Sequence, residues 1–330
     1  MIFSEGSGLN DSIYGKSQAP IRLFLEQRGE AFEQTSVIKH LFNMQKSKNF
    51  GEKATSMTAM SGFQPVGENG AYPEDSMQEG YSKLLVHMTW KDKFAISREM
   101  VEDAKLMDMK KRPAEFVTAY YRTREQFGAA LFGAAIGGQT STRFKGANFD
   151  VASADDCALF YASHPSKVTD KTQSNLFKDA LSDVTIGKME TKMHLFEGDN
   201  GEILDVTPDT IIIPDDYTMK KTLFAALGAD KDPTTSNNGA NYLFGRWNII
   251  VWPYLNKYMT GSNTPWIMMD SKYNETYGGA LWYDRTELEV RSTLDEDTDA
   301  NVWRGYSRYT AGFNDWRFAC CGGISTAGTL

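Results

Sequence analysis

The longest regular pattern of hydrophobic and polar positions begins at Ser97 and continues to residue 136. Apolar side chains recur there every three or four positions, which places them on one face of a helix. Ser97 is a favourable N-cap, and the glycine pair at 137–138 ends the pattern. Because Pro113 has no amide hydrogen, we expect a kink or break near Arg112. A continuous helix would span about 60 Å at about 1.5 Å per residue, which suits a flat, extended subunit better than a compact enzyme.

Alternating patterns and short apolar runs predict several strands. Residues 81–96 alternate between polar and apolar side chains, which predicts one half-buried strand with His87 on its solvent-exposed face. Further strands are predicted at 210–213, 247–252, 266–269, 286–293 and 302–309. Shorter helices are predicted at 36–44, 175–193 and 214–227. Residues 1–19 and 45–80 have no clear period, which predicts an extended arm and a weakly structured segment. The mixture predicts an α+β fold with its strands concentrated late in the chain.

Composition and charge narrow the class of protein. The chain has 330 residues, of which 41% are hydrophobic and 24% are charged, enough to bury a core. Its net charge of −8 argues against a protein whose main task is to hold nucleic acid, because that task needs a basic face. The N-terminal segment lacks the basic and apolar regions of a secretory signal, and no stretch approaches the roughly 20 apolar residues of a membrane span. Three cysteines without regular spacing predict reduced, mostly buried thiols.

Two carboxylates provide the clearest candidate chemistry. Glu287 and Glu289 lie on the same side of one predicted strand, and Arg304 and Arg308 share a side of the next strand. A hydrolase could use such a carboxylate pair, so a carbohydrate-active hydrolase is one alternative function. We favour the simpler interpretation that the glutamates face the arginines across strands or across subunits.

Metal and cofactor signals are weak. Asp295, Asp297 and Asp299 resemble the start of a calcium loop, but Ala300 replaces the glycine of position six and Tyr306 replaces the glutamate of position twelve. The 4 histidines are scattered, and none is paired with cysteine or histidine at a ligand spacing. No phosphate-binding loop and no nucleophile elbow is found. The sequence therefore predicts no cofactor, no metal site and no catalytic residue.

Several short motifs occur in an order that is more informative than any one of them. They lie at 159–165 (LFYASHP), 207–214 (TPDTIIIP), 237–241 (NNGAN), 251–255 (VWPYL) and 312–317 (GFNDWR). This ordered set, which covers about residues 155–320, resembles the major head subunits of tailed bacteriophages, in the group that includes the Mu-like major head protein. Those subunits have the Hong Kong 97-type capsid fold. Where that family often has an acidic residue, this chain has Trp252.

The resemblance implies a division of the chain into consecutive segments. In chain order they are an N-terminal arm (1–50), an extended loop (51–96), a peripheral domain (97–174) with a spine helix at 97–137, an axial domain (175–282), and a return to the peripheral domain (283–330). The arm would lie on neighbouring subunits, and the extended loop would reach over an adjacent subunit.

The function that the resemblance implies is structural assembly, without catalysis. Subunits would form capsomers of five and six copies, which would close into an icosahedral shell around double-stranded DNA held without sequence specificity. Assembly would take place in the host cytoplasm, and its product would be the capsid of the virion. The expected partners are further copies of the chain, a separate scaffolding protein, a portal and a decoration protein, but no membrane. Another virion component, such as a tail or decoration protein, is the second alternative. The residues expected at contacts between subunits are Trp90, Arg112, Glu287, Glu289, Arg304 and Arg308.

Overall fold

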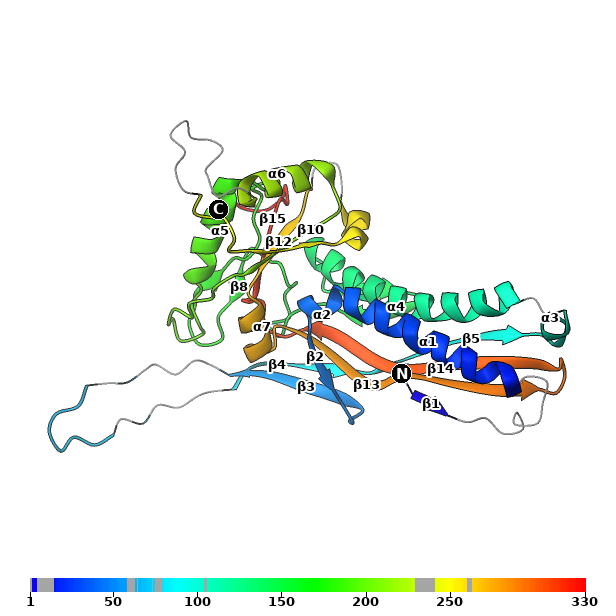
Figure 1. Cartoon of the computed structure of the whole chain (residues 1–330). Coiled ribbons are helices and arrows are strands. Elements are labelled where there is room, and N and C mark those ends of the chain that lie inside the picture. Colours follow the sequence, from blue (N-terminus) through cyan, green and yellow to red (C-terminus); the bar gives the residue numbers. More distant parts are fainter. Residues whose placement is uncertain are drawn as a thin grey trace.

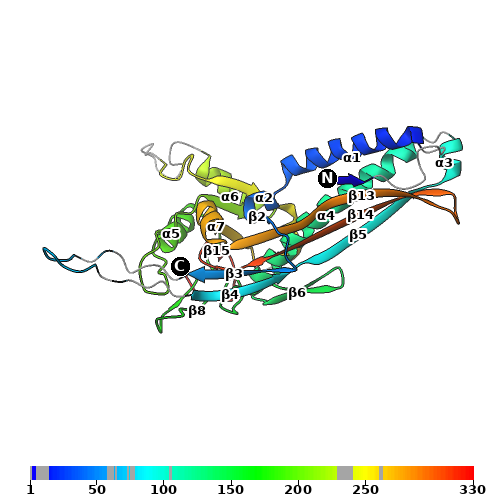
Figure 2. The ribbon, with the colours of Figure 1, turned by 90° about the horizontal axis from the view of Figure 1, so that it is seen from below.

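The protein consists of an elongated body, built on a long sheet, and a compact body at one end of it (Figure 1). The computed structural model describes residues 2–4, 15–57, 63, 65–72, 74, 79–103, 106–228, 241–259 and 263–330. A hairpin projects beyond the compact body, in the direction opposite to the far end of the elongated body (Figure 1, Figure 2). This outline agrees with the flat, extended shape that the long helical pattern predicts.

The sheet of the elongated body has two long strands at its centre, β13 (Ala280–Asp295) and β14 (Ala300–Phe313). β5 (Met88–Ile96) lies antiparallel beside β14, whereas β1 (Ile2–Ser4) and β2 (Asn43–Lys46) lie parallel beside β13. The strand pair predicted at 286–293 and 302–309 is confirmed, and both strands are longer than predicted.

Two helices cover one face of this sheet (Figure 1, Figure 2). α4 (Leu106–Ile136) packs directly on the strands, and α1 (Gly15–Thr35) packs against α4. Phe116 and Val117 of α4 are buried in one cluster with Leu288, Val290 and Trp303 of the sheet. Burial of these side chains, at about 1.5–3 kcal/mol each, holds the helix on the sheet.

The predicted ends of the spine helix are confirmed, and of the kink or break predicted near Arg112 the break is wrong, because α4 runs through Pro113 without a gap. Ser97 caps a short helix, α3 (Arg98–Glu102), by accepting a hydrogen bond from the backbone amide of Met100. α4 ends just before the glycine pair, as predicted. The helical segments separate at Asp103, not near Arg112, and α4 continues through Pro113. Pro113 is buried, so tertiary packing outweighs the one hydrogen bond that the proline removes.

The N-terminal part of the chain is more regular than predicted. Residues 15–19, predicted as extended arm, belong to α1, while residues 1 and 5–14 lie outside the described part. Ile21 and Leu25 of α1 are buried in the cluster that contains Val117. The helix predicted at 36–44 is shortened to α2 (Ile38–Leu41), because the residues of β2 pair with β13 instead.

The projecting hairpin consists of β3 (Gly51–Met57) and β4 (Glu79–Val86). The prediction of a weakly structured segment at 45–80 is therefore wrong for its first third. The single strand predicted at 81–96 is also wrong, because β4 and β5 are separate strands that meet at His87. His87 is buried instead of exposed, and its Nε2 lies 2.9 Å from the Ser47 hydroxyl. Alternation alone could not predict which face of the strand is covered.

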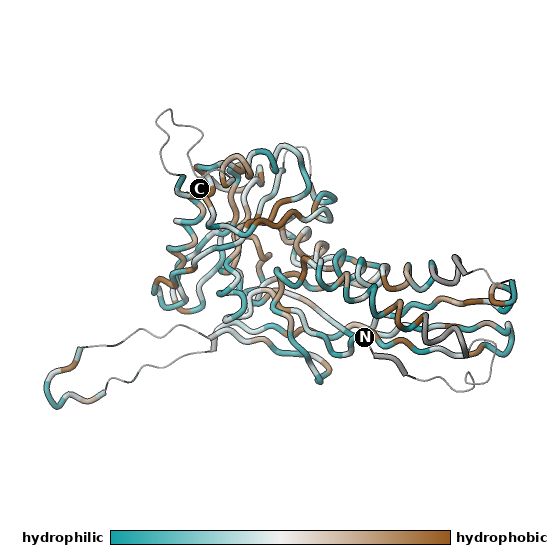
Figure 3. The backbone as a smooth tube through the Cα atoms, viewed as in Figure 1, coloured by the Kyte–Doolittle hydropathy of each residue, from teal (hydrophilic) through white to brown (hydrophobic). Residues whose placement is uncertain are grey.

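The compact body has a sheet of four strands in the order β11 (Asn248–Val251), β10 (Thr210–Ile213), β12 (Trp266–Met269) and β15 (Ala319–Gly322). The helices around it are α5 (Asp183–His194), α6 (Tyr217–Leu227), α7 (Ser271–Tyr277) and the 3-10 helix η1 (Pro253–Tyr258). Figure 3 shows that these central strands are strongly hydrophobic. The strands predicted at 210–213, 247–252 and 266–269 and the helix predicted at 214–227 are confirmed, with small changes at their ends.

The helix predicted at 175–193 begins eight residues later than expected, as α5. Ser182 caps α5 and Thr185 completes the capping box, which fixes the start of the helix. Asn175 is fully buried, and its side-chain amide donates hydrogen bonds to the backbone carbonyls of Leu159 and Ala319. Two small hairpins, β6 (Ser141–Phe144) with β7 (Ala147–Asp150) and β8 (His164–Pro165) with β9 (Thr172–Gln173), complete the fold. Among the described residues, no helix combines the length and the apolar character that a membrane crossing requires.

Candidate functional site

Two of the residues predicted at subunit contacts are engaged within the chain. The indole ring of Trp90 stacks on Tyr309, with ring centroids 4.9 Å apart, and also contacts Phe127 of α4 at 5.5 Å. The guanidinium group of Arg112 donates a hydrogen bond to the backbone carbonyl of Ala95 and so joins α4 to β5. These contacts give both residues a role inside one subunit, and their contact with a neighbouring subunit stays a prediction.

Glu287 and Glu289 do not form one site. The register of β13 shifts between Asp284 and Glu289, so the two side chains enter different surroundings. Glu287 lies 2.7 Å from the ammonium group of Lys46 and lines a hollow of about 410 Å³ beside α1. Glu289 lies 3.4 Å from Arg291 and lines a separate hollow of about 790 Å³. The hydrogen bond from Lys46 lowers the pKa of Glu287, whereas a general acid at neutral pH needs a raised one.

The strand register brings basic residues together on the open face of the sheet, the face turned away from α4. Arg304 lies opposite Arg291 on one side and opposite Lys93 on the other, and Lys91 lies two residues before Lys93 on β5. The predicted pairing of Glu289 with an arginine of β14 is therefore wrong within this chain, because Tyr306 lies opposite Glu289. Arg308 lies opposite Thr286 and Thr89. We call Lys91, Lys93, Arg291 and Arg304 the basic face.

A buried ion pair, which the sequence did not predict, joins α4 to the centre of the sheet. The Arg124 guanidinium donates two hydrogen bonds to the Asp284 carboxylate, at 2.8 and 2.9 Å, and a third to the Tyr120 hydroxyl at 3.0 Å. The guanidinium carbon also lies 4.8 Å from the centre of the Trp282 ring. Both charged groups are removed from water, so loss of either one would leave the other buried without its counter-charge. The two residues together therefore hold α4 on the sheet.

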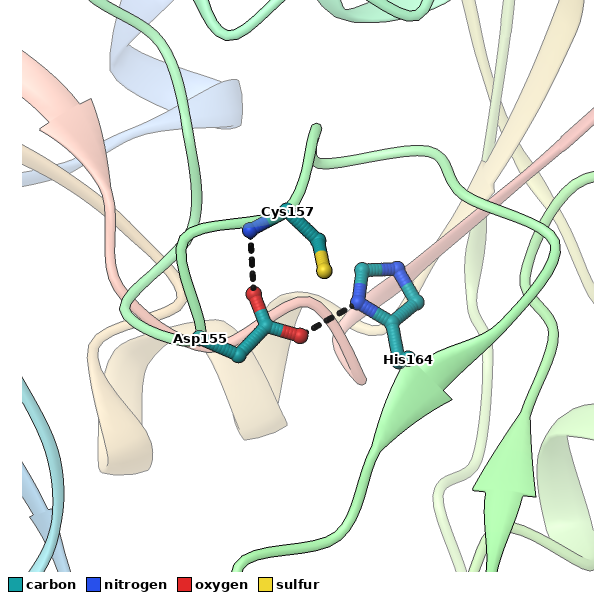
Figure 4. A group of neighbouring side chains, drawn as sticks. All are labelled: Asp155, Cys157 and His164. Carbon is teal, nitrogen blue, oxygen red and sulfur yellow. Dashed lines mark hydrogen bonds and ion pairs between the residues drawn. The ribbon is translucent and has the colours of Figure 1, made fainter.

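A group of three potential metal ligands lies beside the compact body, in the segment that follows β7. Asp155, Cys157 and His164 each offer one ligand atom, and these atoms lie within 4.8 Å of one another (Figure 4). The spacing in the sequence gave no metal signal, because only the fold brings Cys157 to His164. The hydrogen bonds of these three side chains determine whether they are available to a metal ion.

These hydrogen bonds indicate a structural role. Nδ1 of His164 lies 2.6 Å from one oxygen of Asp155, and Nε2 lies 3.2 Å from the side-chain oxygen of Asn175. The other Asp155 oxygen accepts hydrogen bonds from the Ser153 hydroxyl and the Cys157 amide. Burial, together with the charges of Asp155 and its neighbour, raises the pKa of the Cys157 thiol to about 11. A metal ion would have to break the His164–Asp155 contact, and the protonated thiol is a poor nucleophile.

The fold is that of a viral shell subunit. The capsid of Ralstonia phage GP4 is similar with a TM-score of 0.53 and 10% identity, over 87% of this chain and 90% of that chain. The capsid of cyanophage P-SCSP1u gives a TM-score of 0.52 and 10% identity, over 87% of each chain. A structure from Mycobacterium phage Patience gives 0.50 and 11%, over 94% of this chain and 89% of that chain. At these identities the likeness shows the fold alone, and it is the Hong Kong 97-type capsid fold that the motif order predicts.

The sequence match places the chain in a family. The phage capsid protein family matches residues 82–321, and the chain belongs to this family. No curated protein sequence matches the chain. Fold and family together confirm the prediction of a major capsid protein of a tailed phage, a structural component of the virion.

Proposed function

We propose that this chain assembles into capsomers of five and six copies, which close into an icosahedral shell around double-stranded DNA. The observation that carries the proposal is the projecting β3–β4 hairpin (Figure 1). Its loop presents Phe63 and Tyr72 with exposed fractions of 108% and 98%, and Val66 with 52%. Large apolar side chains at the tip of an extended loop are typical of a surface that another molecule covers.

Burial of this loop on a neighbour would stabilise the assembly. Complete burial of an aromatic side chain is worth about 1.5–3 kcal/mol, so Phe63 and Tyr72 together would supply about 3–6 kcal/mol per contact. Each subunit gives one loop and receives one, so contacts add around a ring by multivalency. Weak single contacts thus suffice to close a stable shell.

The segments that the resemblance implies fit this proposal. Residues 1–50 would act as the arm, although part of this arm is the helix α1. Residues 51–96 would act as the loop that reaches over a neighbour, although their last strand, β5, belongs to the sheet of the elongated body. The elongated body, from 97–174 and 283–330, would form the peripheral domain, and the compact body, from 175–282, would form most of the axial domain. β15 of the last segment pairs with β12, so the C-terminal strand belongs to the compact body instead.

We propose the remaining partners on the basis of the net charge and of the family resemblance. A net charge of −8 favours a container that holds DNA by confinement and makes few contacts with it. Shell closure in the host cytoplasm would use a separate scaffolding protein and a portal, and a decoration protein could bind the finished shell. We do not favour a hydrolase, because Glu287 and Glu289 lie in different hollows.

The test is the size of the purified full-length chain in sedimentation velocity and electron microscopy. We expect the wild-type chain to form capsomers or shells, and the variant F63S/Y72S to remain in smaller species because it loses the apolar contact. The matched control, F63L/Y72F, keeps apolar side chains at both positions and should assemble like the wild type. A wild-type chain that stays monomeric at high concentration would contradict the proposal, as would normal shells from F63S/Y72S.

A further inference from the structure

We propose that a hollow between α4 and the sheet of the elongated body binds a small, uncharged aromatic molecule that carries a hydroxyl group. The hollow measures about 290 Å³ and is bordered by α4 on one side and by β5, β13 and β14 on the other. It lies on the face of the sheet that α4 covers, opposite to the basic face. The proposal goes beyond assembly, because it assigns a ligand to the interior of a single copy of the chain.

Two buried hydroxyl groups of β14 line this hollow without a partner. Ser307 and Tyr309 are alternate residues of the strand, so both side chains point to the face that α4 covers. Their exposed fractions are 1% and 0%, and among the described residues neither hydroxyl group has a hydrogen-bond partner. Proteins pair nearly all of their buried polar groups, because an unpaired one has lost its water and gained nothing in return. The two hydroxyl groups therefore indicate an occupant that supplies the missing partners.

A third hydroxyl group, that of Tyr120 on α4, adds a hydrogen-bond donor to the same hollow. Its oxygen accepts a hydrogen bond from the Arg124 guanidinium at 3.0 Å, which leaves its own proton to be donated. The Ser307 hydroxyl lies next to it, but not in a geometry that makes a hydrogen bond. Burial raises the pKa of both Tyr120 and Tyr309, so both phenol groups keep their protons at neutral pH. A ligand oxygen could therefore accept hydrogen bonds here and also donate one.

The size and the walls of the hollow favour an aromatic ligand over water. At about 30 Å³ per molecule, the hollow would need about ten waters to fill it. Much of its wall is apolar, formed by Trp90, Phe116, Leu288 and the ring of Tyr309. Water beside such a wall gives up hydrogen bonds, whereas an aromatic ring gains contact with it. Apolar walls with a few convergent polar groups are typical of a small-molecule site, and they match a ring that carries one hydroxyl group.

The charges beside the hollow favour an uncharged ligand. The Arg124 guanidinium already donates two hydrogen bonds to the Asp284 carboxylate, at 2.8 and 2.9 Å. Lys145 lines the hollow, but it is exposed and donates a hydrogen bond to the Thr123 hydroxyl at 3.0 Å. The exposed carboxylate of Asp92 lies in the same lining and carries the opposite charge. A bound carboxylate would lose its water and compete with Asp284 for Arg124, whereas a neutral hydroxyl group would not.

Three probes of nearly the same shape test the chemistry of the ligand. Isothermal titration calorimetry of the full-length chain with p-cresol should give a dissociation constant below about 1 mM, which ligands of this size can reach. Toluene lacks the hydroxyl group and should bind at least about fivefold more weakly, because it leaves the buried hydroxyl groups unpaired. The anion 4-methylbenzoate should also bind at least about fivefold more weakly, because its charge has no free counter-charge in the hollow.

Variants of the lining test where the probe binds. Y309F and S307A each remove one unpaired hydroxyl group, so each should weaken p-cresol at least about threefold without lowering the thermal stability of the free chain. In Y309F the difference between p-cresol and toluene should also shrink, which a purely structural effect would not cause. A119M fills the hollow with a longer side chain and should weaken p-cresol more than about tenfold. The matched control is A114M, the same change on the same helix at a residue that does not line the hollow, and it should bind p-cresol like the wild type.

Several results would overturn the proposal. A wild-type chain that does not bind p-cresol at about 10 mM would leave the hollow to water. Unchanged affinity in A119M would place the probe elsewhere on the chain, and equal binding of toluene, or unchanged affinity in both Y309F and S307A, would show that the hydroxyl groups do not recognise it. Tighter binding of 4-methylbenzoate than of p-cresol would make the site one for anions. All of these measurements report binding to one chain, so they do not depend on whether the chain assembles.

Discussion

The ion pair between Arg124 and Asp284 gives the sharpest prediction about the stability of the subunit. Arg124 lies on α4 and Asp284 on β13, and their side chains are only 9% and 16% exposed. The substitution R124M keeps the length of the side chain but removes its charge and its hydrogen bonds. The Asp284 carboxylate would then keep the Trp282 indole N–H, at 3.1 Å, as its donor. A buried carboxylate that loses its cation costs about 3–5 kcal/mol.

The double variant separates this cost from the net value of the pair. R124M/D284L replaces both charges with apolar groups, which restores a matched interior and should cost less than about 2 kcal/mol. The loss in the double variant should therefore be smaller than the loss in R124M alone, in contrast to the additive result expected of independent sites. The helix would stay on the sheet because Phe116, Val117 and their apolar partners still pack.

The assay is urea unfolding, followed by circular dichroism, in the F63S/Y72S background that keeps the chain unassembled. Every variant should show the same dependence on urea, so that the midpoint reports the free energy of unfolding. The control K188M, on the exposed side of α5, should stay within about 0.5 kcal/mol of the parent chain. A loss below about 1 kcal/mol in R124M, or additive losses in the double variant, would refute the argument that the pair is desolvated.

Two further predictions concern the Asp155–Cys157–His164 group. Burial raises the pKa of Asp155, but the hydrogen bonds from His164 and Ser153 outweigh it and lower the pKa below the usual 3.8. The stabilisation is thus complete above pH 3.8 and is lost as the pH falls through the lower folded value; D155N should lack this part of the acid dependence in urea titrations and cost about 1–3 kcal/mol at pH 7. Because the pKa of Cys157 is about 11, its alkylation at pH 8, measured by mass spectrometry, should be more than about tenfold slower than that of a free cysteine; a faster reaction would mean that the thiol is activated.

Local signals in the sequence were sufficient to predict an element whose own residues mark its two ends and supply its apolar pattern. The helix α6 has Asp216 as its N-cap and Gly228 at its C-terminal end, and these two residues lie close to the ends of the range predicted for it, 214–227. The buried strand β10 contains the apolar run 211–213, and Asp209 and Pro214 flank the strand. Such elements could be predicted because the information lies within a dozen residues.

Elements that depend on distant partners could not be predicted in the same way. α1 is stabilised by contact with α4, and Ile21 and Leu25 are too short a pattern to predict it. β3 is defined by its pairing with β4, across a loop of more than twenty residues. His87 shows the same limit, since the alternation of its strand was seen but the covered face was assigned wrongly.

Of the four residues of the basic face, only Arg304 was predicted at a subunit contact, and that contact stays a prediction. Arg304 was expected at a subunit contact, and the open face of the sheet carries it. The bulges in β13 separate Glu287 from Glu289, and no sequence pattern announces them. Lys91 and Lys93 join Arg304 only because β5 pairs with β14, a contact between segments about 200 residues apart.

The basic face and the β3–β4 loop are both exposed in a single copy, and weak contacts made by such surfaces suit a shell that must assemble without errors. An exposed ion pair contributes only about 0.2–1 kcal/mol, so a single loop placed wrongly on a neighbour can dissociate and bind again. A ring of subunits makes many such contacts at once, and their sum holds the ring together. Because exposed charges are screened beyond about 10 Å at 0.1 M salt, the same contacts make assembly sensitive to ionic strength. The apolar side chains of Phe63 and Tyr72 do not share this sensitivity, so charge would select the docking surface and apolar burial would retain the loop there.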